Sequence, residues 1–360
     1  MSVFMPGARR RFAGACFLAG MMLACVEPQK IQTIHHWNVS ESKLIDAQPS
    51  DEGLQVVRST AVRTAVEAYL PDGNVSRRTF FDHPISFVLS AGNTTYFVEE
   101  ISPARNRIIR VDPDGSTNVV SQEGNWTQIV KGPRGHVFGV ESLFLSRDIP
   151  PSAGRLYNLT RGEIAFEDNF SYHYPFAGDA MLLVSPLDRH VRFLENGKAR
   201  EIGSVTSLDF PPLVSHDGSR TIWFGPGGSG STLYLCDAKG HVSTLLTPLT
   251  ERPVAWLGDD ILVGYQDALT TGWILKRTSV ADGLVRATIP VPPNVVLTGM
   301  LGSPRGDFIG LPTPTGSLLI RLSDGFIQEI SSSLSTWRFS RDGSRLWIVE
   351  QGDLMVIDLK

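Results

Sequence analysis

Cysteine is scarce in this chain of 360 residues, which contains only Cys16, Cys25 and Cys236. The first two lie in and directly after an N-terminal apolar stretch, so a domain folded beyond that stretch retains Cys236 alone. A single thiol cannot form an internal disulfide. Cys236 lies in a strand-like segment, where we expect it to be a small buried apolar residue.

Several signals of catalysis and of nucleic-acid binding are missing. The formal net charge is −4, so nothing is basic enough to indicate a nucleic-acid partner. No G-x-S-x-G, H-E-x-x-H, C-x-x-C or Walker pattern occurs. We therefore expect no metal and no cofactor, and the sequence does not indicate an enzyme.

The N-terminus has the pattern of an export signal. Arg9, Arg10 and Arg11 precede the apolar stretch Phe12–Ala24, which is shorter than the about 20 residues of a membrane-spanning helix but suits a secretory signal. Met22-Leu23-Ala24-Cys25 resembles a bacterial lipobox, although that family prefers leucine where this chain has Met22. The resemblance implies that Cys25 receives lipid and becomes the new N-terminus. An ordinary secretory signal is the alternative, and Arg9–Phe12 also resembles part of a twin-arginine signal.

These features divide the chain into a signal peptide (1–24), a lipidated tether (25–53) and a folded domain (54–360). The tether prediction rests on a polar, aperiodic segment that contains Pro28 and Pro49. His35 and His36 lie in this segment, but adjacent side chains diverge and no third ligand is spaced nearby. We therefore expect no metal site there.

Glycines recur at intervals of roughly forty residues, each between two short β-rich segments, as in stacked blades. They are Gly92, Gly135, Gly178, Gly218, Gly258, Gly306 and Gly343. A second series of turns alternates with the first, at Gly115, Gly162, Gly197, Gly240, Gly283 and Gly325. Two alternating turns in each repeat join four strands, as in a β-propeller blade. The sequence predicts an all-β, seven-bladed propeller.

The last repeat is one strand short, because the chain ends after the segment Leu354–Leu359. A bare edge would expose unpaired N–H and C=O groups, so an N-terminal strand is expected to close the ring. We predict that this strand is Val75–Phe81, which directly precedes the strand Ile85–Ser90. The turn Leu70-Pro71-Asp72-Gly73 leaves eight blades possible. The segment Thr60–Leu70 fits a strand as well as a helix.

Two of the turns resemble a known family. Val214-Ser215-His216-Asp217-Gly218-Ser219-Arg220 and Phe339–Leu346 resemble the S-x-D-G-s-r repeats of Tol-associated and related WD-like bacterial propellers. Ser303–Asp307 is a degenerate copy. The resemblance covers most of the chain as architecture but only two repeats as motif. It implies a binding platform and carries over no catalytic residues.

Three short patterns have a simpler explanation than chemistry. Gly225–Gly230 fits G-x-G-x-x-G, but a strand pattern follows it instead of the helix that a dinucleotide site needs. Arg305-Gly306-Asp307 spells an adhesion tripeptide within a tight turn. Asp259 and Asp260 are neighbours on a strand, so their side chains point to opposite faces. We expect none of the three to be a site.

Aromatic residues in two long connections are the best candidates for a partner-binding surface. Phe166–Phe176 is expected to connect two blades, and Ser142–Gly154 to join two strands within one blade. Aromatic side chains with a polar rim are typical of interface centres. The alternative is that these rings pack between blades. The predicted partner-binding residues are Trp126, Phe144, Phe170, Tyr172, His173 and Tyr174.

The favoured hypothesis is a non-enzymatic, lipid-anchored propeller that acts as a scaffold for proteins of the bacterial envelope. Val26-Glu27 after Cys25 lacks the aspartate familiar as an inner-membrane retention signal in enteric bacteria, so we expect the outer membrane. The alternatives are a propeller hydrolase or lyase with a site at the mouth of the central channel, and a glycan-binding module. A propeller enzyme can assemble its site from single residues on several blades, so missing motifs do not exclude it.

Overall fold

Strands form all of the regular structure that can be described in this chain. The computed structural model describes residues 32–36, 43–50, 53–59, 63–91, 93–103, 105–131, 136–142, 154–168, 172–175, 180–185, 188–228, 230–249, 254–266, 272–292, 295–333, 336–349 and 353–359. Contacts divide the chain into Met1–Lys30 and Ile31–Lys360, and every described residue lies in the second unit. None of the described residues belongs to a helix long and apolar enough to cross a membrane.

The strands group into eight antiparallel sheets of four, which we call blades 1 to 8. Blades 1 to 4 contain β2 (Lys43–Pro49), β3 (Leu54–Ser59), β4 (Thr64–Tyr69), β5 (Val75–Phe81), β6 (Ile85–Ala91), β7 (Thr94–Ser102), β8 (Arg105–Val111), β9 (Thr117–Val119), β10 (Trp126–Lys131), β11 (Val137–Ser142), β12 (Gly154–Asn158), β13 (Glu163–Asp168), β14 (Tyr172–Pro175), β15 (Ala180–Val184), β16 (His190–Glu195) and β17 (Lys198–Ser204).

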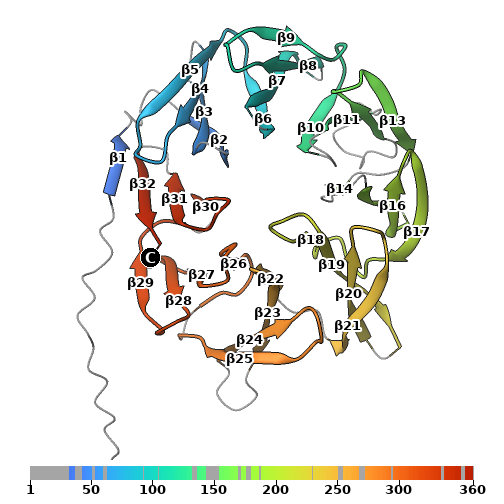
Figure 1. Cartoon of the computed structure of the whole chain (residues 1–360), viewed down its shortest axis with the longest axis vertical. Helices are drawn as coiled ribbons and strands as arrows, with labels where there is room; N and C mark the ends of the chain where they lie inside the picture. Colours follow the sequence, from blue (N-terminus) through green and yellow to red (C-terminus); the bar gives the residue numbers. More distant parts are fainter. Residues whose placement is uncertain are drawn as a thin grey trace, which may run out of the picture. The chain divides into compact units, whose positions relative to one another are not determined.

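Blades 5 to 7 follow with four consecutive strands each, and blade 8 has three strands of its own. They contain β18 (Leu213–Val214), β19 (Arg220–Gly227), β20 (Gly230–Asp237), β21 (Val242–Leu249), β22 (Val254–Leu257), β23 (Asp260–Gln266), β24 (Trp273–Ser279), β25 (Val285–Pro290), β26 (Leu301–Gly302), β27 (Phe308–Thr313), β28 (Gly316–Arg321), β29 (Ile327–Ile330), β30 (Trp337–Phe339), β31 (Arg345–Val349) and β32 (Asp353–Asp358). Figure 1 shows the blades arranged in a ring, so the predicted β-propeller is confirmed.

The fourth strand of blade 8 is β1 (Gln32–His36), which comes from the other end of the chain. It pairs antiparallel with β32, from Gln32 opposite Val356 to His36 opposite Asp353, with a bulge after Thr33. Figure 1 shows β1 on the outer side of β32. The backbone groups along this edge of β32 are thereby paired rather than left open.

Closure by an N-terminal strand is therefore confirmed, but Val75–Phe81 is not that strand. It is β5, the outer strand of blade 1, where it pairs with β4. Blade 1 already has four strands because β2 lies within 43–49, a segment predicted to be tether. The ring thus has eight blades, the number that the sequence left possible, and the predicted tether 25–53 contains β1 and β2.

Strands β1 and β2 were assigned to the tether because their sequences lack the usual pattern of a strand. An outermost strand such as β1 is held by backbone pairing along one edge, so its sequence needs little apolar alternation. β2 contains both Lys43 and Pro49, residues that are depleted in strands. The segment Thr60–Leu70 was predicted to be either a strand or a helix. In the structure, Thr64–Tyr69 is a largely buried strand.

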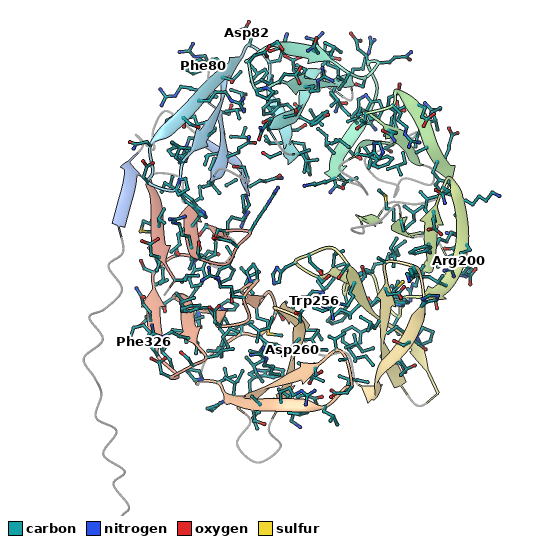
Figure 2. All side chains as sticks on the ribbon, viewed as in Figure 1. Phe80, Asp82, Arg200, Trp256, Asp260 and Phe326 are labelled. Atoms are coloured by element: carbon teal, nitrogen blue, oxygen red, sulfur yellow. The ribbon has the colours of Figure 1, made fainter. Side chains whose placement is uncertain are left out.

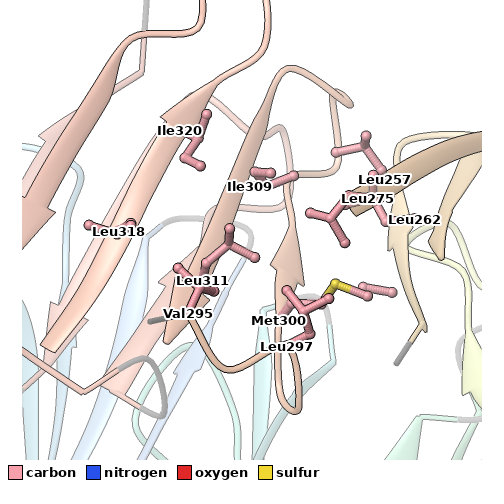
Figure 3. Packing of buried hydrophobic residues seen from close by; sticks show 11 residues of the cluster. Leu257, Leu262, Leu275, Val295, Leu297, Met300, Ile309, Leu311, Leu318 and Ile320 are labelled. Carbon is pink, nitrogen blue, oxygen red and sulfur yellow. The ribbon is translucent and has the colours of Figure 1, made fainter. Parts of the chain in front are cut away.

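Each pair of adjacent blades shares one cluster of buried apolar side chains, so eight clusters cover the eight junctions. Figure 3 shows the cluster between blades 6 and 7, where Leu262 and Leu275 of blade 6 face Ile309 and Leu311 of blade 7. At the closing junction, Trp347 and Val356 of blade 8 pack with Val56 and Tyr69 of blade 1. Strand pairing and apolar packing therefore close the ring together.

The predicted glycine turns are turns in the structure wherever they can be described. Gly218, Gly258, Gly306 and Gly343 have φ of 72°, 58°, 78° and 67°, a region that side chains disfavour. Gly92, Gly135 and Gly178 lie outside the described residues. All six glycines of the second series also have positive φ, between 70° and 86°.

Polar side chains cross most junctions as well, and five of them are arginines in consecutive blades. We call these the inter-blade arginines: Arg200 donates to the Gly240 carbonyl, Arg220 to Asp259, Arg277 to the Gly306 carbonyl, Arg305 to the Asp342 carbonyl and Arg338 to the Ala47 carbonyl. Charge-assisted hydrogen bonds of this kind are among the stronger ones. They connect blades 4 through 8 and join blade 8 to blade 1.

The remaining described junctions use other groups. Gln55 donates to Thr95 between blades 1 and 2, and Asn106 exchanges two hydrogen bonds with the Trp126 backbone between blades 2 and 3. Between blades 3 and 4 the described contacts are apolar, through side chains such as Phe138, Leu156 and Met181.

Removing the closing strand should open the last blade. A chain that begins at Ser42 lacks β1, so the outer edge of β32 loses its backbone partner. We expect a thermal midpoint several degrees lower than that of a chain beginning at Ile31, which keeps β1, together with self-association in light scattering. Equal midpoints and equal monomer content for the two chains would contradict closure by β1.

A methyl group at Gly302 should separate blades 6 and 7. A Cβ there would lie 2.0 Å from the Trp256 carbonyl oxygen, and a backbone atom cannot move aside easily. We expect Gly302→Ala to lower the free energy of unfolding by about 2–3 kcal/mol in urea titrations. The control is Gly228→Ala, whose Cβ would meet nothing within 4 Å; if it costs as much, crowding at the junction is not the cause.

Candidate functional site

The ring has two chemically different faces. Turns between first and second strands and between third and fourth strands share one face, which we call the turn face. Leu322 follows the third strand of blade 7, and its amide donates to the carbonyl of Asp307 in the turn between the first two strands. In blade 8 the Leu359 amide, after the third strand, likewise donates to the Ser344 carbonyl. The end of the third strand therefore lies beside the first turn. The opposite face, the loop face, holds the connections between second and third strands and those between blades.

A pocket of about 230 Å³ lies on the turn face where blade 8 meets blade 1. It is lined by Ser50, Gly53, Pro71, Ser340, Arg341, Asp342, Arg345 and Trp347. Trp347 is 1% exposed, and its indole N–H has no hydrogen-bond acceptor among the described residues. The lining thus combines polar side chains with a buried indole ring whose N–H is unpaired within the described part of the chain.

The charges around this pocket are largely balanced. Arg345 pairs with Asp358 at 3.1 Å. Hydrogen bonds from Ser340 and Ser344 lower the pKa of Asp342, so this carboxylate is ionised at neutral pH. Burial lowers the pKa of Arg341. With charges of both signs, the pocket has no marked preference for an anion or a cation.

Behind the pocket, a charged cluster is buried at the same junction. Glu67 is 1% exposed, accepts a hydrogen bond from Tyr69 at 3.0 Å and pairs with Arg78 at 2.5 Å. Burial, followed by the nearby Glu67 carboxylate, raises the pKa of Tyr69. The tyrosine therefore stays a neutral donor, and the cluster fixes the outer part of blade 1.

The S-x-D-G turn of blade 5 carries a histidine that sequence reasoning did not single out. Desolvation lowers the pKa of His216, an effect that hydrogen bonding with the backbone of Trp256 and Gly302 partly offsets. These partners belong to the first strands of the next two blades, and the side chain is still reached by solvent. A neutral imidazole can accept a proton, but backbone groups beside it supply no nucleophile.

The same turn contains a carboxylate that holds it closed. Asp217 accepts hydrogen bonds from the Ser215 hydroxyl at 2.6 Å, the Ser219 hydroxyl at 2.6 Å and the Ser219 amide at 3.0 Å. Partial burial alone would raise the pKa of Asp217, but these bonds outweigh it and lower the pKa to about 2. The turn is therefore stabilised by the ionised form.

Trp126, one of the predicted partner-binding residues, lies in the apolar cluster between blades 2 and 3. Trp126 is 5% exposed; it donates from its indole to the Gln122 carbonyl and packs against Tyr157. Of the two interpretations left open, packing between blades describes this ring, so Trp126 is not an exposed anchor. Phe144 and Phe170 lie outside the described residues.

Tyr172, His173 and Tyr174 were predicted in a connection between blades, and this placement is wrong. They belong to β14, the first strand of blade 4, and pair with Val184, Leu183 and Leu182 of β15. Alternating tyrosines suit a strand. Their side chains lie outside what can be described. Ser142 and Gly154, in contrast, do end β11 and begin β12 as expected.

The other singled-out patterns behave as turns, hairpins or ion pairs. Asp259 pairs with Arg220 and Asp260 with Arg277, so the adjacent carboxylates do not act on one site. β19 extends through Gly227, so the glycine-rich pattern starts within a strand and not in a loop. Burial raises the pKa of Cys236 to about 12, which leaves a buried, protonated thiol as predicted.

Exposed apolar side chains are distributed around the ring in the part of the chain that the structure describes. Most lie on outer strands, for example Phe80 on β5, Ile164 on β13 and Val285 on β25. Figure 2 shows Phe80 and Phe326 on the outer rim, where Arg63 and Arg321 lie over their rings at 4.0 and 5.2 Å. Among the same residues, no three His, Cys, Asp or Glu side chains gather as a metal site.

Comparison with solved structures shows the fold alone. The eukaryotic initiation factor matches with a TM-score of 0.56 at 13% identity, covering 91% of this chain and 88% of that one. BamB from Moraxella catarrhalis matches with 0.51 at 12% identity (92% and 100%), and the β-propeller domain of the trilobed protease from Pyrococcus furiosus with 0.50 at 15% (80% and 95%). No protein-family model matches the chain, and no curated protein sequence does either.

Acid should weaken the blade 5 turn in a defined pH range. Because the pKa of Asp217 is lower in the folded chain than its usual value near 3.8, its contribution is present above pH 4 and disappears as the pH falls towards 2. We expect Asp217→Asn to lower stability by about 1 kcal/mol at pH 7. In urea titrations this difference should shrink between pH 4 and pH 2. A difference that does not change with pH would show that ionisation is irrelevant there.

Proposed function

We propose that this protein is a lipid-anchored β-propeller of the bacterial cell envelope, held at the outer membrane, that presents a surface to other envelope proteins. The observation that carries the proposal is the lipobox-like Met22–Cys25 followed so closely by the ring-closing strand at Gln32. The chain leaves the lipidation site and enters the fold within one short segment. Only residues 26–31 separate the proposed lipidation site from the strand that closes the ring.

The architecture supports a binding role for the ring. Clusters of buried side chains at every junction and the inter-blade arginines hold the described blades in fixed positions. A rigid scaffold that positions loops is the usual basis of recognition surfaces. The described carboxylates near the turns are engaged in structural hydrogen bonds and ion pairs, which supports binding over catalysis.

Lipidation is tested by removing its acceptor. Cys25→Ser should move the protein from the detergent-extracted membrane fraction to the soluble periplasmic fraction of bacteria that express it. The folded ring should stay intact, as judged by an unchanged thermal midpoint of the purified protein. If the variant remains in the membrane fraction as completely as the parent, a lipid on Cys25 is not the anchor.

The partner-binding role is tested by photo-crosslinking from two aromatic positions. A benzophenone side chain at Phe144, in the β11–β12 connection, should crosslink to envelope proteins in living cells. The same group at Phe80, an exposed aromatic on the outer rim, is the control and should not. Crosslinks from both positions in equal amount, or from neither, would count against a specific scaffold surface.

A further inference from the structure

We infer that the turn face, at blades 8 and 1, is the side of the ring next to the lipid bilayer, and that the loop face is the side offered to partners. The inference rests on the proposed lipid anchor and adds its orientation. It follows from the direction of β1 and from the length of chain that precedes β1.

The direction of β1 is set by its pairing. β32 runs from Asp353 to Asp358 and ends beside the turn of Ser344, because the Leu359 amide donates to the Ser344 carbonyl. Gln32 lies opposite Val356, near that end, and His36 lies opposite Asp353. The chain therefore enters the ring at the turn face and runs towards the loop face.

The chain before β1 is short, so the face at which it enters the ring decides which face lies near the bilayer. Residues 26–31 link Cys25 to Gln32, and a link of that length spans at most about 25 Å when fully extended. A strand such as β28, from Gly316 to Arg321, separates the two faces by about 20 Å. Turning the loop face to the bilayer would therefore require a nearly extended link that runs along the side of the ring.

The turn face does not attract a bilayer by charge. Backbone amides in the turns lower the pKa of Asp72, Asp114 and Asp282, and the Arg321 side chain, followed by a backbone amide, lowers that of Asp324. All four carboxylates are therefore ionised at neutral pH at the tips of outer turns. Asp282 and Asp324 are moreover paired with Arg286 and Arg321, so charge is not what turns this face towards the bilayer, and the orientation rests on the link alone.

This arrangement leaves the loop face free. The long β11–β12 connection, which contains Phe144, begins and ends there, at Ser142 and Gly154. Connections on this face differ more in length between blades than the glycine turns, as expected where a scaffold varies its contacts. A protein partner would then approach from the side away from the membrane.

The orientation is tested with fluorescent labels at both ends of one strand. Thr315 and Ser323 are exposed, flank β28 and lie in blade 7, next to the anchored blade. Ser323→Cys labels the turn face, and Thr315→Cys is its matched control on the loop face. Cys236 is buried with a raised pKa, so each variant of the lipidated protein carries one reactive thiol.

Each labelled variant is reconstituted in vesicles of phosphatidylethanolamine and phosphatidylglycerol that contain a headgroup-labelled energy acceptor. Because the two sites lie ~20 Å apart across the ring, we expect energy transfer about twofold greater from position 323 than from position 315. Equal transfer, or greater transfer from position 315, would overturn the orientation while the anchor stands. If neither variant associates with vesicles, the lipid anchor itself is wrong.

Discussion

Pairing between β1 and β32 is the constraint on which the rest of this structure depends. Without β1, blade 8 has three strands and an open outer edge. With β1 in place, the first and last strands of the folded chain belong to one sheet. Opening the ring there requires breaking strand pairing as well as apolar packing.

The junctions between blades distribute this stability around the ring. Each has its own apolar cluster, and Arg220, Arg277, Arg305 and Arg338 add polar contacts from blade 5 to blade 1. These arginines donate to a backbone carbonyl or an aspartate of the following blade, so each blade fixes the position of the next. The junction between blades 3 and 4 differs, because its described contacts are apolar.

Much of the fold could be predicted from the sequence because tight turns have strict backbone requirements. Gly218, Gly306 and Gly343 adopt positive φ, which few other residues accept. Strands β1 and β2 were not predicted by the same reasoning, since both have weak strand patterns and β1 is held by pairing with β32 at the other end of the chain. Strands β1 and β32 are more than three hundred residues apart in the sequence, so no local sequence pattern indicates that they pair.

The candidate site was less predictable. For Trp126 both a partner-binding surface and packing between blades were left open, because an aromatic residue at a strand start suits either environment; the ring is buried against Tyr157. His216 and Trp347 acquire their properties from neighbours on other blades, which no local motif indicates. Only the position of the β11–β12 connection could be predicted correctly, since it depends on where two strands end.

Hydrogen exchange of the β32 backbone tests the central claim most directly. If β1 closes the ring, amides of residues 353–359 should exchange as slowly as those of an interior strand such as β24 in the intact protein. The amides of β32 that point towards β1 should exchange much faster in a chain that begins at Ser42, while those that point towards β31 stay protected. Fast exchange of 353–359 in the intact chain would contradict closure by β1, and with it the attachment of the anchor to the ring.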